Sequence, residues 1–268
     1  MVVQHNIGAL TAYRNLGINQ GGLNGNLEKL SSGYRINRAG DDAAGLAISE
    51  NMRAQIRGLN QAARNAQEAV GLIKTAEGGL TEIHAMLQRM STLATQGANG
   101  TYNSVAQKNI QAEVDELLDE IDRISANTNF NGVYTLKGAA STQLQIGTTA
   151  PEIMTVEARD MSSAILGGSL NVTGVSAANA AMSTIRTAIN TVSEFRAELG
   201  AKQDRLEFTY NNLYVTAENL TDAESRIRDT DMPEEITAFT KNNILVQASQ
   251  SMLAQANAVP QSVLSLLQ

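Results

Sequence analysis

The sequence has no cysteine, no tryptophan, three prolines and two histidines among its 268 residues. Without cysteine, disulfides, thiolate catalysis and cysteine-bound zinc are excluded. His5 and His84 offer very little for a histidine-dependent catalytic or metal site. No phosphate-binding loop or dinucleotide fingerprint occurs either. We therefore expect no enzymatic activity, no cofactor and no bound metal.

Long apolar runs and excess positive charge are also missing. No run of 18 apolar residues occurs, so we expect no membrane insertion. The net charge of −7 argues against a nucleic-acid partner, which would need a basic face. The first residues, MVVQHNIGAL, lack the charged and apolar regions of a secretory signal. The protein is expected to stay in the cytosol or to leave by a route that reads no such signal.

Charge is nearly absent from both ends of the chain. Arg14 is the one charged residue in 1–27, and Lys241 is the one in 241–268. That is two charges in 55 residues, whereas the average charged content of 18% predicts ten. Tails that lie in solvent are normally polar and charged. We therefore expect both ends to be buried together against something.

Apolar residues at the two ends recur about every seven residues, which predicts amphipathic helices. Asp231 can cap the last helix, with Glu234 three residues further on. Pro260 is expected to kink or interrupt that helix. The terminal seam, which we predict to be the assembly surface, consists of Tyr13, Leu16, Leu23, Leu27, Leu30, Ile236, Phe239, Val246, Leu253, Leu264 and Leu267.

The middle of the chain is patterned more strongly. A strict alternation of four and three residues from Ile185 to Ile227 predicts one long helix, which needs partners along its length. The seams at 52–94 and 110–124 supply those partners, and Ser104 with Gln107 is placed as a capping box.

Only residues 130–176 break the helical pattern. Asn131-Gly132 is a hairpin-type turn pair, and short β-like runs follow near Leu144 and Ile153. The small residues of 176–181 are expected to link back into the long helix. The predicted fold is mainly α: a long antiparallel coiled-coil or helical-bundle rod with a small β-hairpin unit and paired N- and C-terminal helices.

Four motifs carry a family resemblance over essentially the full length. The first motif combines residues 30–37, LSSGYRIN, with residues 41–45, DDAAG, and the second is NTNFNG at 127–132. Residues 226–232 read RIRDTDM, and 263–268 read VLSLLQ. In this order the motifs closely resemble those of the bacterial flagellins, here in a short form without the variable outer domains. Independently of the resemblance, Asp42 and Asp41 are best interpreted as helix-capping residues before Ala43.

The resemblance implies a subunit that self-polymerises into the flagellar filament used for motility. It implies a terminal assembly domain (1–43 with 229–268), a helical core domain (44–129 with 177–228) and a β-hairpin unit (130–176). The terminal helices would be largely disordered in the monomer and become helical on polymerisation. The alternative is a flagellar hook-filament junction protein, and a cytosolic enzyme is a distant third.

The resemblance also implies partners and a location. The filament is extracellular, and its subunit would pass through the flagellar export apparatus with a chaperone, without a cleavable signal peptide. Hook-associated and cap proteins would contact it. Residues 87–96 resemble the segment recognised by Toll-like receptor type 5 of a host, with Arg89, Leu93 and Glu113 facing the receptor. Ser91-Thr92 stands where family members commonly carry Arg-Glu. The other interpretation of this surface is a contact between subunits.

Overall fold

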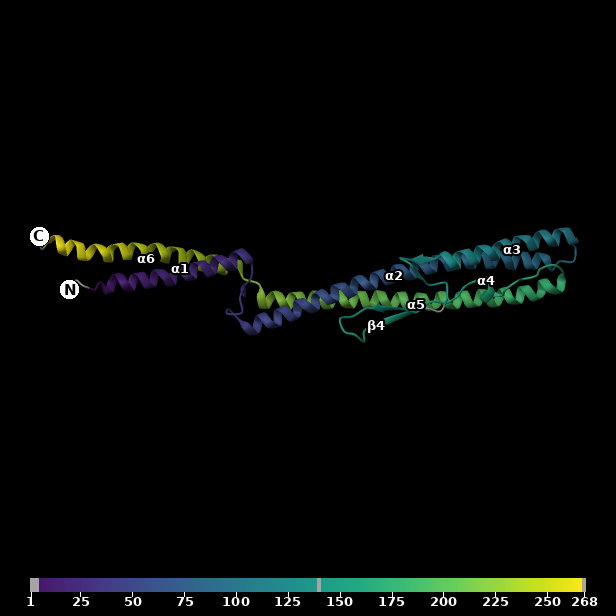
Figure 1. Cartoon of the computed structure of the whole chain (residues 1–268), viewed down its shortest axis with the longest axis horizontal. Helices are drawn as coiled ribbons and strands as arrows, with labels where there is room; N and C mark the ends of the chain where they lie inside the picture. Colours follow the sequence, from purple (N-terminus) through teal and green to yellow (C-terminus); the bar gives the residue numbers. More distant parts are fainter. Residues whose placement is uncertain (1–4, 139–140, 267–268) are drawn as a thin grey trace. The chain divides into compact units, whose positions relative to one another are not determined.

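The structure is a computed structural model that describes residues 5–138 and 141–266, with side chains as far as Val259. Contacts group Met1–Ala54 with Asn219–Gln268 as one compact unit, the terminal unit, and Gln55–Glu218 as a second, the central unit. The domain limits expected at residues 43 and 229 remain a prediction. The elements, drawn in Figure 1, are α1 (Ile7–Ser32), α2 (Ala43–Gly97), α3 (Ser104–Asn127), β1 (Asn129–Phe130), β2 (Val133–Tyr134), β3 (Ser141–Gln145), β4 (Ile153–Glu157), α4 (Ser163–Leu166), α5 (Val175–Arg228) and α6 (Met232–Leu266).

The terminal unit confirms the predicted pairing of the first and last helices, since α1 and α6 lie side by side. Asn6 caps α1 by accepting a hydrogen bond from the backbone N–H of Ala9 at 3.0 Å. Gly33 ends the helix in the left-handed conformation (φ 76°), which glycine adopts without a Cβ penalty.

The central unit confirms the mainly α prediction. Its core lies among α2, α3 and α5, and the predicted long helix is present as α5. Side chains below 2% exposure hold these helices together, and each such large side chain is worth about 1.5–3 kcal/mol of burial. They include Ile73, Leu80, Ile83, Leu87, Met90, Ile121, Ile185 and Phe195.

The expected link at 176–181 is wrong, because these residues form the first turns of α5. Ala178 and Ala181 are buried, and a Cβ added at Gly97 of α2 would stand in ordinary contact with the Cβ of Ala178, at 3.8 Å. The small residues of this stretch are compatible with the helix, because alanine has the highest helix propensity.

The β unit follows the predicted turn chemistry. Asn131 and Gly132 both have positive φ (49° and 82°), as a two-residue type I′ turn requires between β1 and β2. β3 and β4 form a second antiparallel pair, with Gln145 opposite Ile153. Met154 and Val156 alternate into the core, so the hairpin packs against the helices.

The start of α3 differs from the predicted capping box. Asn103, one residue before Ser104, is the N-cap, and its side chain accepts from the N–H of Ala106 at 2.8 Å. Asp122, which belongs to an acidic stretch, accepts from both the N–H and the hydroxyl of Ser163 at 2.7 Å. This carboxylate therefore anchors the start of α4. Within residues 5–138 and 141–266, the chain has no helix that combines the length and apolarity needed to span a bilayer.

Candidate functional site

The contact between α1 and α6 combines polar pairs with partly buried apolar side chains. The Asn19 amide donates to the Ser249 hydroxyl at 2.9 Å, and Lys29 Nζ lies 3.9 Å from Glu235 Oε2. Among the described side chains of both helices, Val246 alone is buried, at 8% exposure. The pair thus has almost no apolar core of its own.

Pro260 does not interrupt α6, which runs unbroken to Leu266, so the expected interruption is wrong, whereas the expected kink stays a prediction. A proline inside a helix has no N–H, and the carbonyl four residues earlier loses its donor. That carbonyl belongs to Ala256, and it accepts a hydrogen bond from the Asn6 side-chain amide at 2.8 Å. Asn6 therefore serves both helices: its oxygen caps α1, and its amide satisfies the carbonyl that Pro260 leaves free.

Replacing Asn6 with aspartate separates these two roles. Asn6→Asp keeps the cap of α1 but loses the donor to Ala256, leaving an unpaired carbonyl facing a carboxylate. We expect the α1–α6 contact to weaken by about 1–3 kcal/mol. Thermal melting of polymerised protein measures this loss. Asn24→Asp, an exposed site on α1, is the matched control and should melt like the unsubstituted chain; equal melting of both variants would refute the dual role.

The residues of the terminal seam differ in burial: some are buried or half-buried, and others are exposed. Val246 is buried, and Leu16, Leu23, Leu30, Phe239 and Leu253 are half-buried. Tyr13, Leu27 and Ile236 are exposed at 68%, 54% and 52%. The side chain of Leu264 and all of Leu267 lie outside the described residues. The contact within one chain therefore uses only part of this seam.

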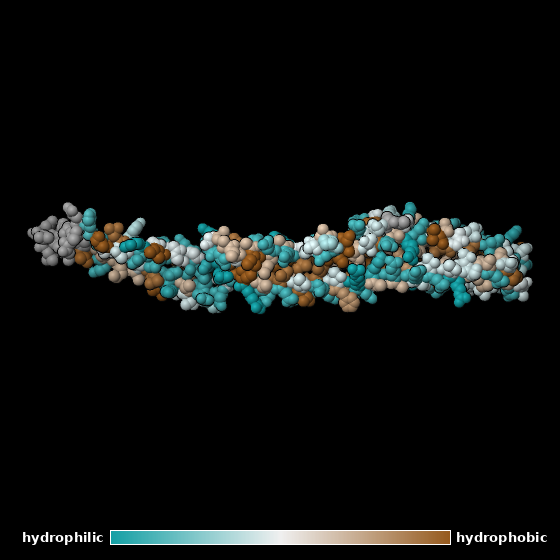
Figure 2. Space-filling model, turned by 90° about the horizontal axis from the view of Figure 1, so that it is seen from below, coloured by the Kyte–Doolittle hydropathy of each residue, from teal (hydrophilic) through white to brown (hydrophobic). Residues whose placement is uncertain are grey.

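Further apolar side chains, absent from the seven-residue pattern, are exposed on the same helices. Figure 2 shows apolar groups on the surface of this helix pair, beside the grey residues. Helices that are apolar on more than one face are typical of helices covered on several sides. The sequence did contain one sign of these exposed apolar residues, namely the lack of charge at both chain ends. A helix face that lies in solvent would carry Lys and Glu. We name the exposed large apolar side chains of α1 and of residues 236–259 of α6, on whichever side of the helices they lie, the outer apolar face. With three members of the terminal seam, it comprises Ile7, Leu10, Tyr13, Ile18, Leu27, Ile236, Ile244, Leu245, Met252 and Val259.

The connections α1–α2 and α5–α6 are hydrogen-bonded to each other within the terminal unit. Tyr34 forms an antiparallel bridge with Asp229, the Arg35 N–H donates to the Arg228 carbonyl at 2.7 Å, and the Thr230 N–H donates to the Gly33 carbonyl at 3.0 Å. We call this pairing the clasp. It joins the LSSGYRIN motif to the RIRDTDM motif, so these two motifs have a structural role.

Arg228 fastens the clasp through its side chain, of which only 11% is exposed. Its guanidinium lies 4.8 Å from the centre of the Tyr34 ring, in cation–π geometry. The same guanidinium pairs with Glu50 of α2 at 2.6 Å. Arg228 therefore ties the loop after α1, the start of α2 and the end of α5 together.

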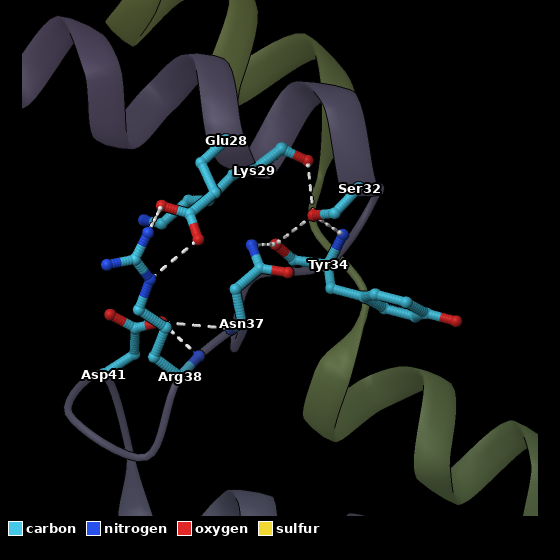
Figure 3. Close-up of polar contacts among 7 residues, drawn as sticks. All are labelled: Glu28, Lys29, Ser32, Tyr34, Asn37, Arg38 and Asp41. Atoms are coloured by element: carbon cyan, nitrogen blue, oxygen red, sulfur yellow. Dashed lines mark hydrogen bonds and ion pairs between the residues drawn. The ribbon is translucent and has the colours of Figure 1, made fainter.

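Acidic side chains also hold the connection between α1 and α2 in place, as Figure 3 shows for Glu28 and Asp41. Arg38 makes two hydrogen bonds of 2.9 Å to Glu28. Asp41 accepts from the N–H groups of Arg38 and Asn37 at 2.9 and 3.0 Å, which lowers the pKa of its carboxyl. Since its pKa is lowered on folding, the support that Asp41 gives is lost as the pH falls through that value. Asp42 accepts from the Gly45 N–H at 2.9 Å, so the predicted cap of α2 is confirmed for Asp42. For Asp41 the prediction is wrong, because its carboxylate bonds to the loop and not to the helix.

The residues with a resemblance to a receptor-binding segment lie in the central unit. Arg89 of α2 and Glu113 of α3 are exposed and form an ion pair at 2.6 Å. Leu93 has only 2% of its surface exposed and belongs to the core. The expectation that Leu93 shares an exposed face with Arg89 is therefore wrong: α3 and α5 both pack on this part of α2 and bury a second face of it.

Within the described part of the chain, no group of three or more His, Asp or Glu side chains is arranged to hold a metal ion. The features described above that can carry a function are the contact between α1 and α6, the outer apolar face and the clasp. Together they define a helical protein that exposes apolar side chains on both of its terminal helices.

The chain belongs to the bacterial flagellin family. Residues 3–141 match the bacterial flagellin N-terminal helical region, and residues 182–267 match the C-terminal helical region. It is 49% identical to a flagellin of Halalkalibacterium halodurans and 48% identical to a flagellin of Bacillus subtilis. It is also 46% identical to a flagellar filament 33 kDa core protein of Treponema phagedenis. All three matches cover 100% of both chains.

Two solved structures have a similar fold. The crystal structure of Bacillus cereus flagellin matches with a TM-score of 0.52 and 33% identity, over 56% of this chain and 88% of that one. A putative flagellar hook-associated protein from Vibrio parahaemolyticus matches with a TM-score of 0.60, over 70% of this chain and 100% of that one. At 13% identity the second match shows a shared fold only.

Proposed function

We propose that this chain is the structural subunit of an extracellular bacterial flagellar filament, which forms by polymerisation of the chain with copies of itself and serves motility. The observation that carries the proposal is the outer apolar face on the nearly uncharged terminal helices. Membership of the flagellin family supports the same role, which is structural and not catalytic.

The terminal seam and the outer apolar face are the contact surfaces we assign to polymerisation. Half-buried seam residues such as Leu16 and Phe239 lie toward the partner helix, whereas Tyr13, Leu27 and Ile236 are available to neighbouring copies. Burial of a large apolar side chain contributes about 1.5–3 kcal/mol. Ten such side chains on the outer apolar face of each copy supply a strong driving force.

Electron microscopy of purified protein tests the proposal directly. After addition of salt or filament seeds, the chain should grow into long filaments. A hook-filament junction protein, the alternative function, should remain short or monomeric under the same conditions. Failure to elongate on seeds of its own kind would favour that alternative.

We further propose that the chain leaves the cell through the flagellar export apparatus with a chaperone, without a cleavable signal peptide, and that it contacts hook-associated and cap proteins. The α1–α6 contact supports the export part of this proposal, because only one described side chain of the pair is fully buried and the pair can open before export. Mass spectrometry of exported protein should find its N-terminal segment intact, and a shortened N-terminus would contradict the proposal.

We also propose Arg89 and Glu113 as contacts for Toll-like receptor type 5 of a host. Their support is exposure and proximity across α2 and α3, together with the resemblance of residues 87–96. Leu93 is left out of this surface because its side chain is in the core.

Replacing both residues of the pair should weaken receptor binding by about tenfold or more, since a charged pair at an interface often costs 2 kcal/mol or more when truncated. The variant Arg89→Ala, Glu113→Ala is compared with Gln61→Ala, an exposed site of α2 outside residues 87–96, by surface binding to the receptor ectodomain. Because the pair is exposed, the melting temperature of the monomer should hardly change. Unaltered affinity of the double variant would remove these residues from the receptor surface.

A further inference from the structure

The dipeptide Asn-Gly occurs three times in the sequence, at 24–25, 99–100 and 131–132. Such a pair can react with itself, because the glycine nitrogen can attack the side-chain amide carbon of the asparagine and close a five-membered ring. Glycine favours this closure, since it has no Cβ to crowd its nitrogen and its backbone is permissive. The reaction needs exposure, a free glycine N–H and a backbone that can rotate, so the fold decides which pair reacts.

Two of the three pairs are held by regular structure. Gly25 lies within α1, where a backbone N–H donates to the carbonyl four residues earlier. The Gly132 N–H donates to Asn129 Oδ1 at 3.4 Å, and Asn131 is held at φ 49° between the paired strands β1 and β2. In both pairs the nitrogen that would attack is engaged in a hydrogen bond, and the backbone is not free to rotate.

The pair Asn99-Gly100 is held much less firmly. It lies in the turn between α2 and α3, and both residues are exposed. Among the described residues, none accepts a hydrogen bond from the Gly100 N–H. The Asn99 side chain is folded toward this nitrogen, because its Oδ1 accepts from the Thr101 N–H at 3.3 Å. The turn is closed by a long hydrogen bond of 3.4 Å from the Tyr102 N–H to the Asn99 carbonyl. The two atoms that must join thus belong to a segment outside regular structure.

We propose that Asn99 is a site of intramolecular deamidation, with water as the co-reactant. The Gly100 nitrogen forms a bond to Cγ of Asn99 while the bond from Cγ to Nδ2 breaks, and ammonia leaves with the proton of the Gly100 N–H. Water then adds to either carbonyl of the ring and opens it to aspartate or isoaspartate. Nothing is oxidised or reduced. This modification goes beyond polymerisation and does not depend on it.

The reaction changes the charge of a neutral part of the surface. Asn99 lines a hollow at the end of α2 together with uncharged side chains, namely Ser91, Thr92, Thr95, Gln96 and Tyr102. Conversion places a carboxylate in this hollow, and the isoaspartate product also adds a methylene group to the backbone between α2 and α3. Each copy of the chain therefore acquires, with time, a negative charge beside residues 87–96.

Peptide mass spectrometry of the full chain, incubated at mildly alkaline pH over a time series, tests the assignment. Asn99 should convert faster than Asn131 by about tenfold or more, a ratio equivalent to about 1.4 kcal/mol of activation free energy. These two sites are compared because both lie in the central unit, whereas Asn24 lies in the terminal unit. In denaturant the two rates should become similar, because the dipeptide is the same and only the fold distinguishes the sites.

Gly100→Ala is the matched variant. A Cβ at Gly100 would meet no described atom within 4 Å beyond its chain neighbours, and the residue does not have positive φ, so the fold accepts alanine there. Conversion of Asn99 should slow by about tenfold or more, because the methyl group crowds the attacking nitrogen, while Asn131 converts as before.

Three results would each overturn the inference: an Asn99 that stays intact in the folded chain, equal rates at Asn99 and Asn131, or an unchanged rate in Gly100→Ala. A rate difference that persists in denaturant would do the same, since it would come from the local sequence and not from the fold. These outcomes leave the proposed polymerisation untouched, which the filament assay tests separately.

Discussion

Leu10→Asp is expected to raise the threshold concentration for polymerisation by about a hundredfold or more. Leu10 lies on the outer apolar face of α1 with 61% of its surface exposed, so the substitution disturbs little within one chain. In a polymer that covers this face, an unpaired carboxylate would lose its water, which costs several kcal/mol, and each 1.4 kcal/mol is a tenfold change. Sedimentation of polymer across a concentration series measures the threshold.

Asn15→Asp supplies the matched control, because it adds the same charge at an exposed polar site of the same helix. Its effect should be much smaller, since it replaces no buried apolar surface. The melting temperature of the monomer should be the same for both variants and the unsubstituted chain. Normal polymerisation of Leu10→Asp would show that this face stays in water.

Hydrogen exchange of dilute monomer should find the terminal helices almost unprotected. Five glycines, at positions 8, 17, 21, 22 and 25, lie within α1, and each costs about 1 kcal/mol relative to alanine. Val246 is the one buried side chain described in the pair, so tertiary contacts return little. We expect protection factors below about 100 in α1 and α6, against more than about 10⁴ around Phe195 in α5.

In polymerised protein, the same amides of α1 and α6 should become strongly protected, because neighbouring copies cover the helices. The comparison uses one chain in two states, so the central unit serves as the internal reference. Strong protection of both terminal helices in the dilute monomer would mean that the pair is stable alone, contrary to the expected order of folding and assembly.

Periodicity in the sequence identified the helices and the pairing of the chain ends correctly, because both depend on one apolar face per helix. It missed the burial of Leu93, since α2 packs against α3 and α5 and a single seam cannot reveal a second buried face. It also missed Ile18 and Met252 on the outer apolar face, which fall outside the seven-residue pattern.

Turns and helix caps were predicted well where the backbone requires one residue type, and less well where several residue types can fill the position. Asn131 and Gly132 occur as the positive-φ turn needs. At the start of α3, asparagine and serine are both good caps, so the sequence could not decide between Asn103 and Ser104. The uninterrupted α6 could not be predicted at all, because the donor that compensates Pro260 comes from Asn6, 250 residues away.

The clasp and the α1–α6 pair have a consequence for synthesis on the ribosome. Residues 33–35 have no partner strand until 228–230 have been made, and α1 has no partner helix until α6 follows. About 200 residues separate these segments, so translation at about 5–20 residues per second leaves a window of roughly 10–40 s. Throughout that window the nascent N-terminal segment lacks the partners within its own chain that it has in the structure.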